Sequence, residues 1–351
     1  MASQLSGKVQ TVLGSIDPSA MGVTITHEHL VIDMSGYSFT PDEATLRGLW
    51  DRPYTMDMVG SYQSIVWFNR DLMQLYSEEE ALSEVRRFML AGGGTVVDTT
   101  NWDLGRSPGT LARISRATGL NIVMGCSHYV PLLRPPDMDE RTEESIYDRI
   151  VADIRVGAGE TGVKSGVIGE VGNVHPLDDN QRKVLRASAQ AHLDTGAPIS
   201  IHPGGVDESP MAILEELEEA GADLTRVIMG HLDFAVRDNA VLKSVAETGC
   251  FLEYDTVGAE DSGMSYMRAE LRMPTDGERL SALDFLVEEG YGDRILLAQD
   301  VCFKKMHVAS GGKGFAHIVE SIVPRLKRRG YTQNQIDGFL VRNPAAALVF
   351  S

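Results

Sequence analysis

Eight short β-rich runs alternate with segments of helical pattern along the chain. The runs are apolar on both faces, as the strands of a parallel sheet are when helices cover both of its sides. A strand followed by a helix, repeated eight times, is the pattern of a (β/α)8 TIM barrel of roughly 250 residues. We therefore predict an α/β fold of this type. Its strands are expected at residues 23–27, 95–98, 122–126, 167–170, 199–202, 227–231, 251–255 and 295–300.

The remaining length of the 351-residue chain fits additions to one barrel better than a second domain. No polar linker or low-complexity segment separates two halves, so residues 1–351 are predicted to form a single domain. Before the first strand, residues 9–13 and a Gly14-Ser15 turn predict a short N-terminal β-hairpin whose second strand returns toward Gly22.

The largest addition follows the first predicted strand. Residues 35–77 hold eight of the 23 Phe, Tyr and Trp residues of the chain, and a loop of this length is uncommon unless it has a role. The loop ends where Ser77 precedes three glutamates, which predicts the N-cap of a helix. Its aromatic residues are expected either to form a wall of a substrate pocket or to pack on the barrel rim or in a dimer contact, and both can hold.

His27 and His29 stand at the end of the first predicted strand. Residues two apart on a strand point to the same face, about 6.6 Å apart, so both imidazoles can bind one cation while Glu28 faces away. On a helix the same spacing would turn them to nearly opposite sides. A His-X-His pair alone is a weak indication of a metal, so the prediction depends on what the other strands supply.

Further potential ligands stand at the ends of other predicted strands. The carboxyl ends of barrel strands meet at one rim, where catalytic side chains converge. Four imidazoles and two carboxylates are too many for one tetrahedral zinc, but they suit two cations that share a bridging carboxylate. The predicted ligands are His27, His29, Glu170, His202, His231 and Asp300.

A binuclear centre of this kind predicts hydrolytic chemistry. Two cations lower the pKa of a shared water from about 15.7 toward neutrality, which makes hydroxide available. Asp300 is predicted to bind one cation and to accept the proton as hydroxide attacks. Tyr129, close after the third strand, is a candidate to hydrogen-bond the hydroxide or the substrate. Thr100, after the second strand, is predicted to belong to a structural turn.

The composition limits the partners and the location of the protein. A formal net charge of −18 argues against binding to nucleic acid or to an anionic membrane, both of which require clustered Lys and Arg. The N-terminus lacks the charged and apolar blocks of a signal peptide, and no apolar run approaches the ~18 residues of a membrane span. Three widely separated cysteines suit reduced thiols better than a disulfide framework. We expect a cytoplasmic protein that acts on a small molecule.

These motifs together resemble the phosphotriesterase family of the amidohydrolase superfamily, which includes phosphotriesterase-like lactonases and phosphotriesterase-related proteins. The resemblance spans nearly the whole chain. It rests on Val-Gln-Thr-Val-Leu-Gly near the N-terminus, Thr-His-Glu-His-Leu, Val-Asp-Thr-Thr with Gly105-Arg106, Ile-His-Pro-Gly, Gly-His-Leu-Asp and the strand that ends in Asp300. It implies a homodimer and two divalent metal ions, zinc first, with manganese, cobalt or iron as alternatives.

The resemblance also divides the six ligands between two metals. The more buried metal would be held by His27, His29 and Asp300, and the more exposed one by His202 and His231. Glu170 would bridge both. Many family members have a carboxylated lysine at this place, whereas Lys164 lies six residues earlier, before the strand, and cannot take it. The shorter Glu must bring its backbone nearer the metals, which leaves the metal spacing and the preferred ion open.

A second departure from the family follows the seventh predicted strand. Lactonases of the family that open acyl-homoserine lactones often carry an Arg in this loop, where the chain has Glu-Tyr-Asp-Thr-Val-Gly at 253–258. This weakens an acyl-homoserine lactonase assignment. Arg268, Arg272, Lys304 and Lys305, in the loops after the seventh and eighth strands, are expected to lie in solvent, with contact to a substrate carboxylate or phosphate as the alternative.

The sequence therefore predicts a metal-dependent hydrolase that attacks an ester-like carbonyl, with a lactone as the first choice of substrate and phosphotriester hydrolysis as a side activity. An amidase that acts on N-acyl amino acids with the same centre is the alternative. A mononuclear deaminase is less favoured, because it would not need Glu170 as a bridge. A ligand-binding barrel whose metals are structural is the alternative from a different class.

Overall fold

The eight predicted strands form the barrel in the computed structural model, which describes residues 5–61, 65–260 and 273–351. Five strands pair in the order β12-β11-β10-β9-β8 and three in the order β3-β6-β7, all of them parallel. Backbone hydrogen bonds from Gly166 to Met124 and from Asp300 to His27 join the two arcs. The strands are β3 (Val23–Glu28), β6 (Gly93–Asp98), β7 (Asn121–Met124), β8 (Ile168–Gly172), β9 (Ile199–His202), β10 (Val227–Met229), β11 (Phe251–Tyr254) and β12 (Ile295–Leu297). The (β/α)8 prediction is confirmed.

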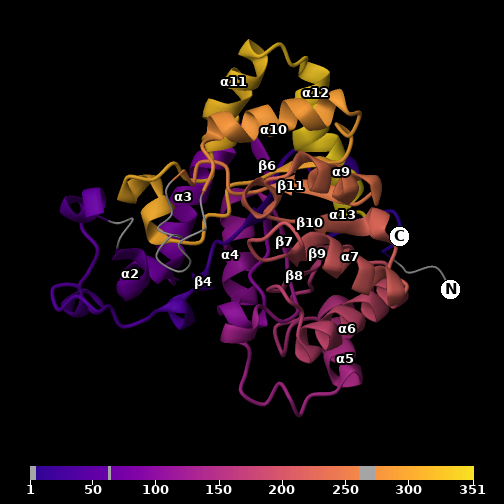
Figure 1. Cartoon of the computed structure of the whole chain (residues 1–351), viewed down its shortest axis with the longest axis horizontal. Helices are drawn as coiled ribbons and strands as arrows, with labels where there is room; N and C mark the ends of the chain where they lie inside the picture. The colour runs from indigo at the N-terminus through magenta and orange to yellow at the C-terminus, as the bar shows by residue number, and fades with distance from the viewer. Residues whose placement is uncertain (1–4, 62–64, 261–272) are drawn as a thin grey trace.

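Helices follow the barrel strands and surround them (Figure 1). They are α2 (Arg70–Met73), α3 (Glu78–Leu90), α4 (Pro108–Thr118), α5 (Glu143–Arg155), α6 (Asp179–Thr195), α7 (Ser209–Glu219), α8 (Leu232–Ala235), α9 (Asn239–Glu247), α10 (Asp276–Glu288), α11 (Val323–Arg328), α12 (Gln333–Asp337) and α13 (Asn343–Leu348), with π-helical segments at Ile318–Ile322 and Gly338–Arg342. The predicted N-cap of α3 is confirmed, because the Ser77 hydroxyl accepts the Glu80 N–H at 3.2 Å. Among the described residues, no helix combines the length and the apolar composition that crossing a membrane requires.

The N-terminal hairpin is present, but its turn does not lie where the sequence predicted it. β1 (Val9–Thr11) pairs antiparallel with β2 (Gly14–Ile16), with Thr11 opposite Gly14. The turn therefore lies between these two residues, and Gly14 already belongs to the second strand. The Thr11 side chain explains the early turn, because its hydroxyl donates to the Gly14 carbonyl and accepts the Leu13 N–H.

The long segment after β3 packs as a cluster of its own beside the barrel. β4 (Ile32–Asp33) and β5 (Gln74–Leu75) pair antiparallel and bring the two ends of the segment together. Between them, buried aromatic and aliphatic side chains form a hydrophobic cluster that is separate from the barrel core. In Figure 1 this indigo segment lies on the left, opposite the C-terminus. The segment is thus held by an apolar cluster that it shares with Leu104, Tyr129, Val130, Cys302 and Phe303 of the loops after β6, β7 and β12.

Apolar side chains of alternate residues along the strands fill the barrel interior. Val97, Val123, Ile228, Phe251 and Leu296 belong to one buried cluster, whereas their neighbours in sequence pack in the larger cluster beneath the helices. This alternation follows from the two-residue period of a strand. Charged and polar side chains gather at the carboxyl ends of the strands, above this apolar layer.

Candidate metal centre

All six side chains predicted as ligands lie together at the carboxyl ends of the barrel strands. His27 and Glu170 lie in β3 and β8, His202 ends β9, and His29, His231 and Asp300 follow β3, β10 and β12. Four of the six residues are at most 2% exposed. The structure therefore brings together every residue of the predicted set, while metal binding by these residues stays a prediction.

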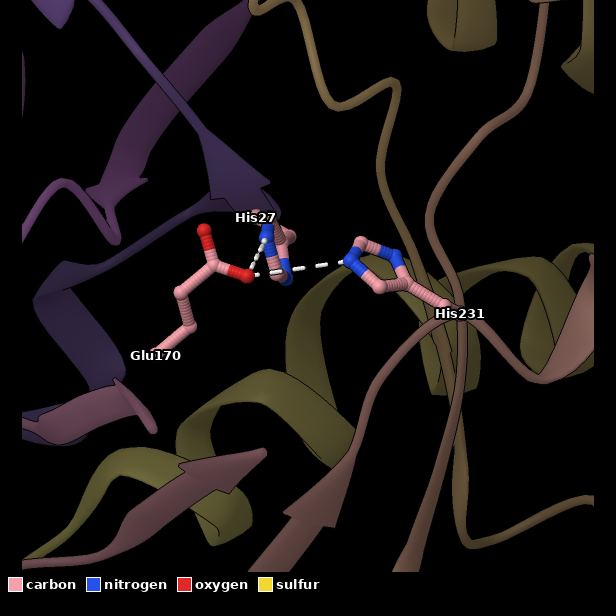
Figure 2. A group of neighbouring side chains, drawn as sticks. All are labelled: His27, Glu170 and His231. Atoms are coloured by element: carbon pink, nitrogen blue, oxygen red, sulfur yellow. Dashed lines mark ion pairs between the residues drawn. The ribbon is translucent and has the colours of Figure 1, made fainter. Parts of the chain in front are cut away.

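The Glu170 carboxylate lies at the centre of the four imidazoles. Its Oε2 atom lies 3.4 Å from His27 Nε2, 3.3 Å from His202 Nδ1 and 3.7 Å from His231 Nε2. Its Oε1 atom lies 3.4 Å from His29 Nε2. Figure 2 shows the carboxylate directed at His27 and His231. A carboxylate whose two oxygens face different imidazoles has the placement that a bridge between two cations requires.

The donor set fits divalent cations. His27 Nε2 and Glu170 Oε2 are buried and have no hydrogen-bond partner among the described residues. Such orphaned atoms are rare and costly, and an ion is one of the groups that satisfy them. The ligand atoms of His27, Glu170 and His231 lie within 4.8 Å of one another, as do those of His27, His29 and Asp300. Nitrogen and carboxylate ligands in two such groups suit a pair of divalent ions.

Two of the predicted ligands have a strained backbone. His231 and Asp300 have φ angles of 55° and 48°, in the left-handed region. A residue with a side chain pays roughly 1–2 kcal/mol for this conformation, and such residues cluster at functional sites. Both stand in the turns that follow β10 and β12, and both have a side chain that faces Glu170 or His29 in the centre.

Two carboxylates at the end of β11 contact the Nδ1 atoms of two of the imidazoles. Asp255 Oδ1 lies 2.7 Å from His231 Nδ1, and its Oδ2 lies 3.2 Å from His27 Nδ1. Glu253 Oε2 also lies 3.2 Å from His27 Nδ1. When Nδ1 carries the proton and donates it to a carboxylate, Nε2 of the same ring is free to bind a cation.

Glu253 and Asp255 were not predicted to support the ligands, since residues 253–258 entered only as a loop that differs from the family. Thr100 was predicted to belong to a structural turn, whereas its hydroxyl lies 2.8 Å from His29 Nδ1. A signal existed for Glu253 and Asp255, which stand two residues apart at the end of an apolar strand, as the two histidines of β3 do. No such signal existed for Thr100, because its partner lies 71 residues away.

The local charges act differently on the six predicted ligands. Burial opposes the charge of His27, His29 and His231, but neighbouring carboxylates raise the pKa of each imidazole, so a cation must displace a proton from them. Burial disfavours the charge of Glu170, yet the surrounding imidazoles, His27 first, hold its pKa well below the usual range. Burial and the neighbouring His231 lower the pKa of His202. Glu170 is therefore ionised and His202 neutral at neutral pH, and these are the forms that bind a cation.

An apolar cavity of about 180 Å³ opens above the centre, and Asp300, His202 and His231 reach it. Tyr37 and Trp67 line the cavity, so the aromatic segment 35–77 supplies part of a pocket wall, as one of the two expectations had it. A dimer contact by the same segment stays a prediction. Other walls come from Met34, Tyr129, Phe234, Phe303 and Met306.

Tyr129 lies in this wall, where the sequence placed it. Burial raises the pKa of Tyr129 well above its usual range, so the hydroxyl keeps its proton at neutral pH. Its Oη atom lies 3.1 Å from His202 Nδ1, at the edge of the centre. The geometry thus places a proton donor beside the cavity, while contact with a substrate stays a prediction.

The basic residues near the mouth differ in position. Lys304 Nζ lies 3.0 Å from Asp71 and 3.4 Å from Glu80, so this lysine belongs to a surface ion-pair network. Lys305 is only 5% exposed, and its ammonium lies 5.8 Å from the centre of the Phe303 ring. The expected solvent position of Lys305 is therefore wrong, because its aliphatic chain is buried. Arg268 and Arg272 lie outside the described residues.

Comparisons with known proteins identify the family. The model of the phosphotriesterase family matches residues 7–348. An N-acetyltaurine hydrolase of Danio rerio is 37% identical over 349 residues, which are 99% of each chain. A solved resiniferatoxin-binding protein from Rhodobacter sphaeroides is 32% identical, with a TM-score of 0.94 over 99% of this chain and 98% of that chain. A solved phosphotriesterase-like lactonase variant from Deinococcus radiodurans is 27% identical, with a TM-score of 0.77 over 97% of this chain and 99% of that chain. The chain is a hydrolase that belongs to the phosphotriesterase family, a family of binuclear metal enzymes.

Proposed function

We propose that the protein hydrolyses the amide bond of a small N-acyl amino acid or N-acyl aminosulfonate, with N-acetyltaurine as the first substrate to test. The observation that carries this proposal is the group of relatives named N-acetyltaurine hydrolase, which are 37% to 38% identical over 99% of this chain. The small apolar cavity above six potential ligands supports it, because an acyl group fits such a space. The amidase alternative thus takes precedence over the lactonase hypothesis.

The centre is proposed to bind two divalent cations, zinc first, with manganese, cobalt or iron as alternatives. Such cations polarise a carbonyl oxygen and lower the pKa of water, which makes water a nucleophile near neutral pH. One ion would be held by His27, His29 and Asp300, and the other by His202 and His231. Glu170, with Oε1 toward His29 of the first group and Oε2 toward His202 and His231 of the second, would bridge the two.

Asp300 is our candidate for the proton transfer. Among the described residues that line the cavity it is the only one with a carboxylate, and its side chain is 18% exposed. Its Oδ1 atom lies 3.2 Å from His29 Nε2, so the same group faces both the centre and the substrate space. We propose that Asp300 accepts a proton from the attacking water and passes it to the amide nitrogen, which must be protonated to leave.

Tyr129 is proposed to donate a hydrogen bond to the substrate carbonyl oxygen. Its hydroxyl stays protonated and lies 3.1 Å from His202, beside the place where the carbonyl must approach. Preorganised donors at such a position stabilise the negative charge that develops on the oxygen during attack. The apolar wall with Tyr37 and Trp67 excludes water around the acyl group.

The test is a product assay with zinc-loaded protein. The substrates are N-acetyltaurine, several N-acetyl amino acids, a γ-lactone, a carboxylic ester and a phosphotriester. We expect the highest kcat/KM for an amide and the lowest for the phosphotriester. Asp300→Asn is expected to lower kcat by at least about 100-fold. Faster hydrolysis of the lactone than of every amide would return the lactonase hypothesis to first place, and binding without turnover of any substrate would support the ligand-binding barrel.

We also propose that the protein is a cytoplasmic homodimer. Its three cysteines, Cys126, Cys250 and Cys302, are free and buried, as suits a reducing compartment. Cell fractionation and light scattering of the purified protein test the two parts separately. Recovery in a secreted fraction, or a mass of one chain in solution, would contradict the corresponding part.

A further inference from the structure

Three consecutive backbone N–H groups around Asp300 bind to β3. The Gln299 N–H donates to Glu28 Oε1 at 2.8 Å, and the Val301 N–H donates to Glu28 Oε2 at 3.0 Å. Between them, the Asp300 N–H donates to the His27 carbonyl at 3.1 Å. The strand that carries His27 and leads into His29 therefore also holds the backbone of a third candidate ligand.

The contact with Glu28 is made at a residue whose backbone conformation is strained. Asp300 has a φ of 48°, which a residue with a side chain rarely adopts. Such a conformation persists only where the surrounding structure fixes it. Glu28 supplies that restraint, because its two oxygens bind the residues on either side. Without it, Asp300 is free to relax toward an extended backbone and to turn its carboxylate away from His29, which it faces at 3.2 Å.

Glu28 has no direct part in the predicted ligand set. It is 0% exposed, and it belongs to none of the metal-ligand groups found among the described residues. A buried carboxylate is costly unless hydrogen bonds satisfy its oxygens. Here two backbone N–H groups bind it, one on each oxygen, and they partly offset burial, which raises the pKa of Glu28 to about 8. The two-residue period of a strand predicts that Glu28 points away from the cation. In that direction, its carboxylate binds the backbone that follows the neighbouring strand β12.

We propose that Glu28 is a positioning residue, whose carboxylate fixes the backbone on both sides of Asp300 and thereby keeps the Asp300 carboxylate facing the metal centre. The inference rests on the proposed function for its effect on turnover, whereas its effect on metal binding does not depend on the substrate. Glu28→Gln tests it with little change of shape. The amide keeps one acceptor oxygen but turns a donor toward the other backbone N–H, so one of the two bonds is lost.

Glu84 provides a matched control. It is 1% exposed and accepts the Val308 N–H at 2.8 Å and the Ala309 N–H at 3.0 Å, again with one bond to each oxygen. The segment that it holds carries none of the six predicted ligands. Glu84→Gln therefore removes the same kind of bond from a similar environment, and it reports the loss of stability alone.

The main readout is zinc affinity, measured by competition with a chelator. We expect Glu28→Gln to weaken zinc binding by about 10- to 100-fold. We expect kcat on N-acetyltaurine to fall by a similar factor, with KM changed by less than about twofold. Glu84→Gln is expected to keep zinc affinity and kcat within about twofold, while its melting temperature falls as much as that of Glu28→Gln.

Two further measurements keep the test decisive if the variant folds poorly or the substrate differs. In the wild-type protein, the amides of Gln299 and Val301 are expected to exchange slowly with deuterium. In an Asp300→Asn background, Glu28→Gln is expected to weaken zinc binding no further, because both changes act on the same ligand. Unchanged zinc affinity in Glu28→Gln, or fast exchange at both amides, would overturn the inference. Absence of amide hydrolysis by the wild-type protein would overturn the proposed function alone.

Discussion

Asp255 contacts candidate ligands of both metals. One of its oxygens lies 2.7 Å from His231 Nδ1 and the other lies 3.2 Å from His27 Nδ1. We predict that Asp255→Asn weakens zinc binding by about 10- to 100-fold, because the Asn amide turns a donor toward one imidazole that must itself donate. Chelator competition, with metal content measured by mass spectrometry, checks this value.

The control for this substitution is a carboxylate–histidine pair outside the ligand groups. Asp276 lies 2.9 Å from His317, and Asp276→Asn removes the same charge from a buried position. We expect a lower melting temperature but unchanged zinc affinity. If Asp255→Asn binds zinc as tightly as the wild-type protein, Asp255 does not hold the ligands in place.

Tyr129 allows a second prediction at the level of a single atom. Tyr129→Phe removes only the hydroxyl that lies 3.1 Å from His202. We predict a fall in kcat of roughly 10²-fold on the amide substrate, which is the usual effect of losing one donor to a developing oxyanion. Zinc content is expected to stay the same, because the hydroxyl is not one of the predicted ligands. Steady-state kinetics and metal analysis decide, and an unchanged kcat would assign Tyr129 to packing alone.

At the scale of the elements, the positions of the candidate ligands could be predicted because strand geometry is regular. Parallel strands of a barrel end at one rim, so a polar residue that closes an apolar run is placed there by topology alone. His202 at the end of β9 and Glu170 in β8 follow this rule, and the structure places both at the centre. The two-residue period of a strand and the topology of the barrel were therefore sufficient to predict where the six side chains lie.

The supporting contacts could not be predicted in the same way, because they join residues that are distant in sequence. Glu28 holds residues 271 and 273 positions later, and no strand or helix period links them. The left-handed backbone of Asp300 likewise depends on this tertiary contact. The predicted position of the turn in the N-terminal hairpin was wrong for a local reason, since the Thr11 side chain closes the turn before the glycine that signalled it.

The segment 35–77 forms an element whose apolar core is separate from that of the barrel, so one large side chain can be removed there without opening the barrel. Trp67 is 2% exposed, lines the cavity, and packs edge to face on Phe303 at 5.3 Å between ring centres. We predict that Trp67→Ala costs about 3–5 kcal/mol of stability and shifts the preference toward longer acyl groups. Denaturant unfolding and a series of N-acyl taurines of increasing length check the two effects.

The matched variant for Trp67→Ala is Phe88→Ala. Phe88 is 0% exposed and packs in the barrel cluster, away from the cavity. We expect a comparable loss of stability with an unchanged preference for acyl length. The same shift in both variants would mean that general loosening, and not the cavity wall, sets the acyl preference.

At the scale of the whole molecule, few groups change their charge between pH 6.5 and 9. Most of the 50 Asp and Glu stay ionised and most of the 32 Lys and Arg stay protonated over this range. Groups with shifted pKa values therefore dominate any pH dependence of stability there. Several of these groups lie in or beside the centre, so its titration can be followed in the unfolding of the entire chain.

The metal-free centre is expected to lose stability as the pH rises. Burial opposes the charge of His29, but hydrogen bonds to Asp300 and Glu170 raise its pKa from 6.5 to about 9. A raised histidine pKa contributes stability that is complete below about 6.5 and is lost as the pH approaches 9. Burial raises the pKa of Glu28 to about 8 and that of Glu253 to about 7. A raised carboxyl pKa also loses its contribution as the pH rises through it.

We therefore predict that the melting temperature of the metal-free protein falls between pH 6.5 and 9. Zinc is expected to oppose this fall, because it binds the neutral imidazole in place of the proton and so binds more tightly as the pH rises. Tighter binding to the folded state adds stability in proportion to the logarithm of the affinity. Calorimetry of chelator-treated and zinc-loaded protein measures both curves. Parallel curves would show that zinc does not replace protons on these imidazoles, and a metal-free protein that gains stability over the same range would contradict the charge state assigned to His29.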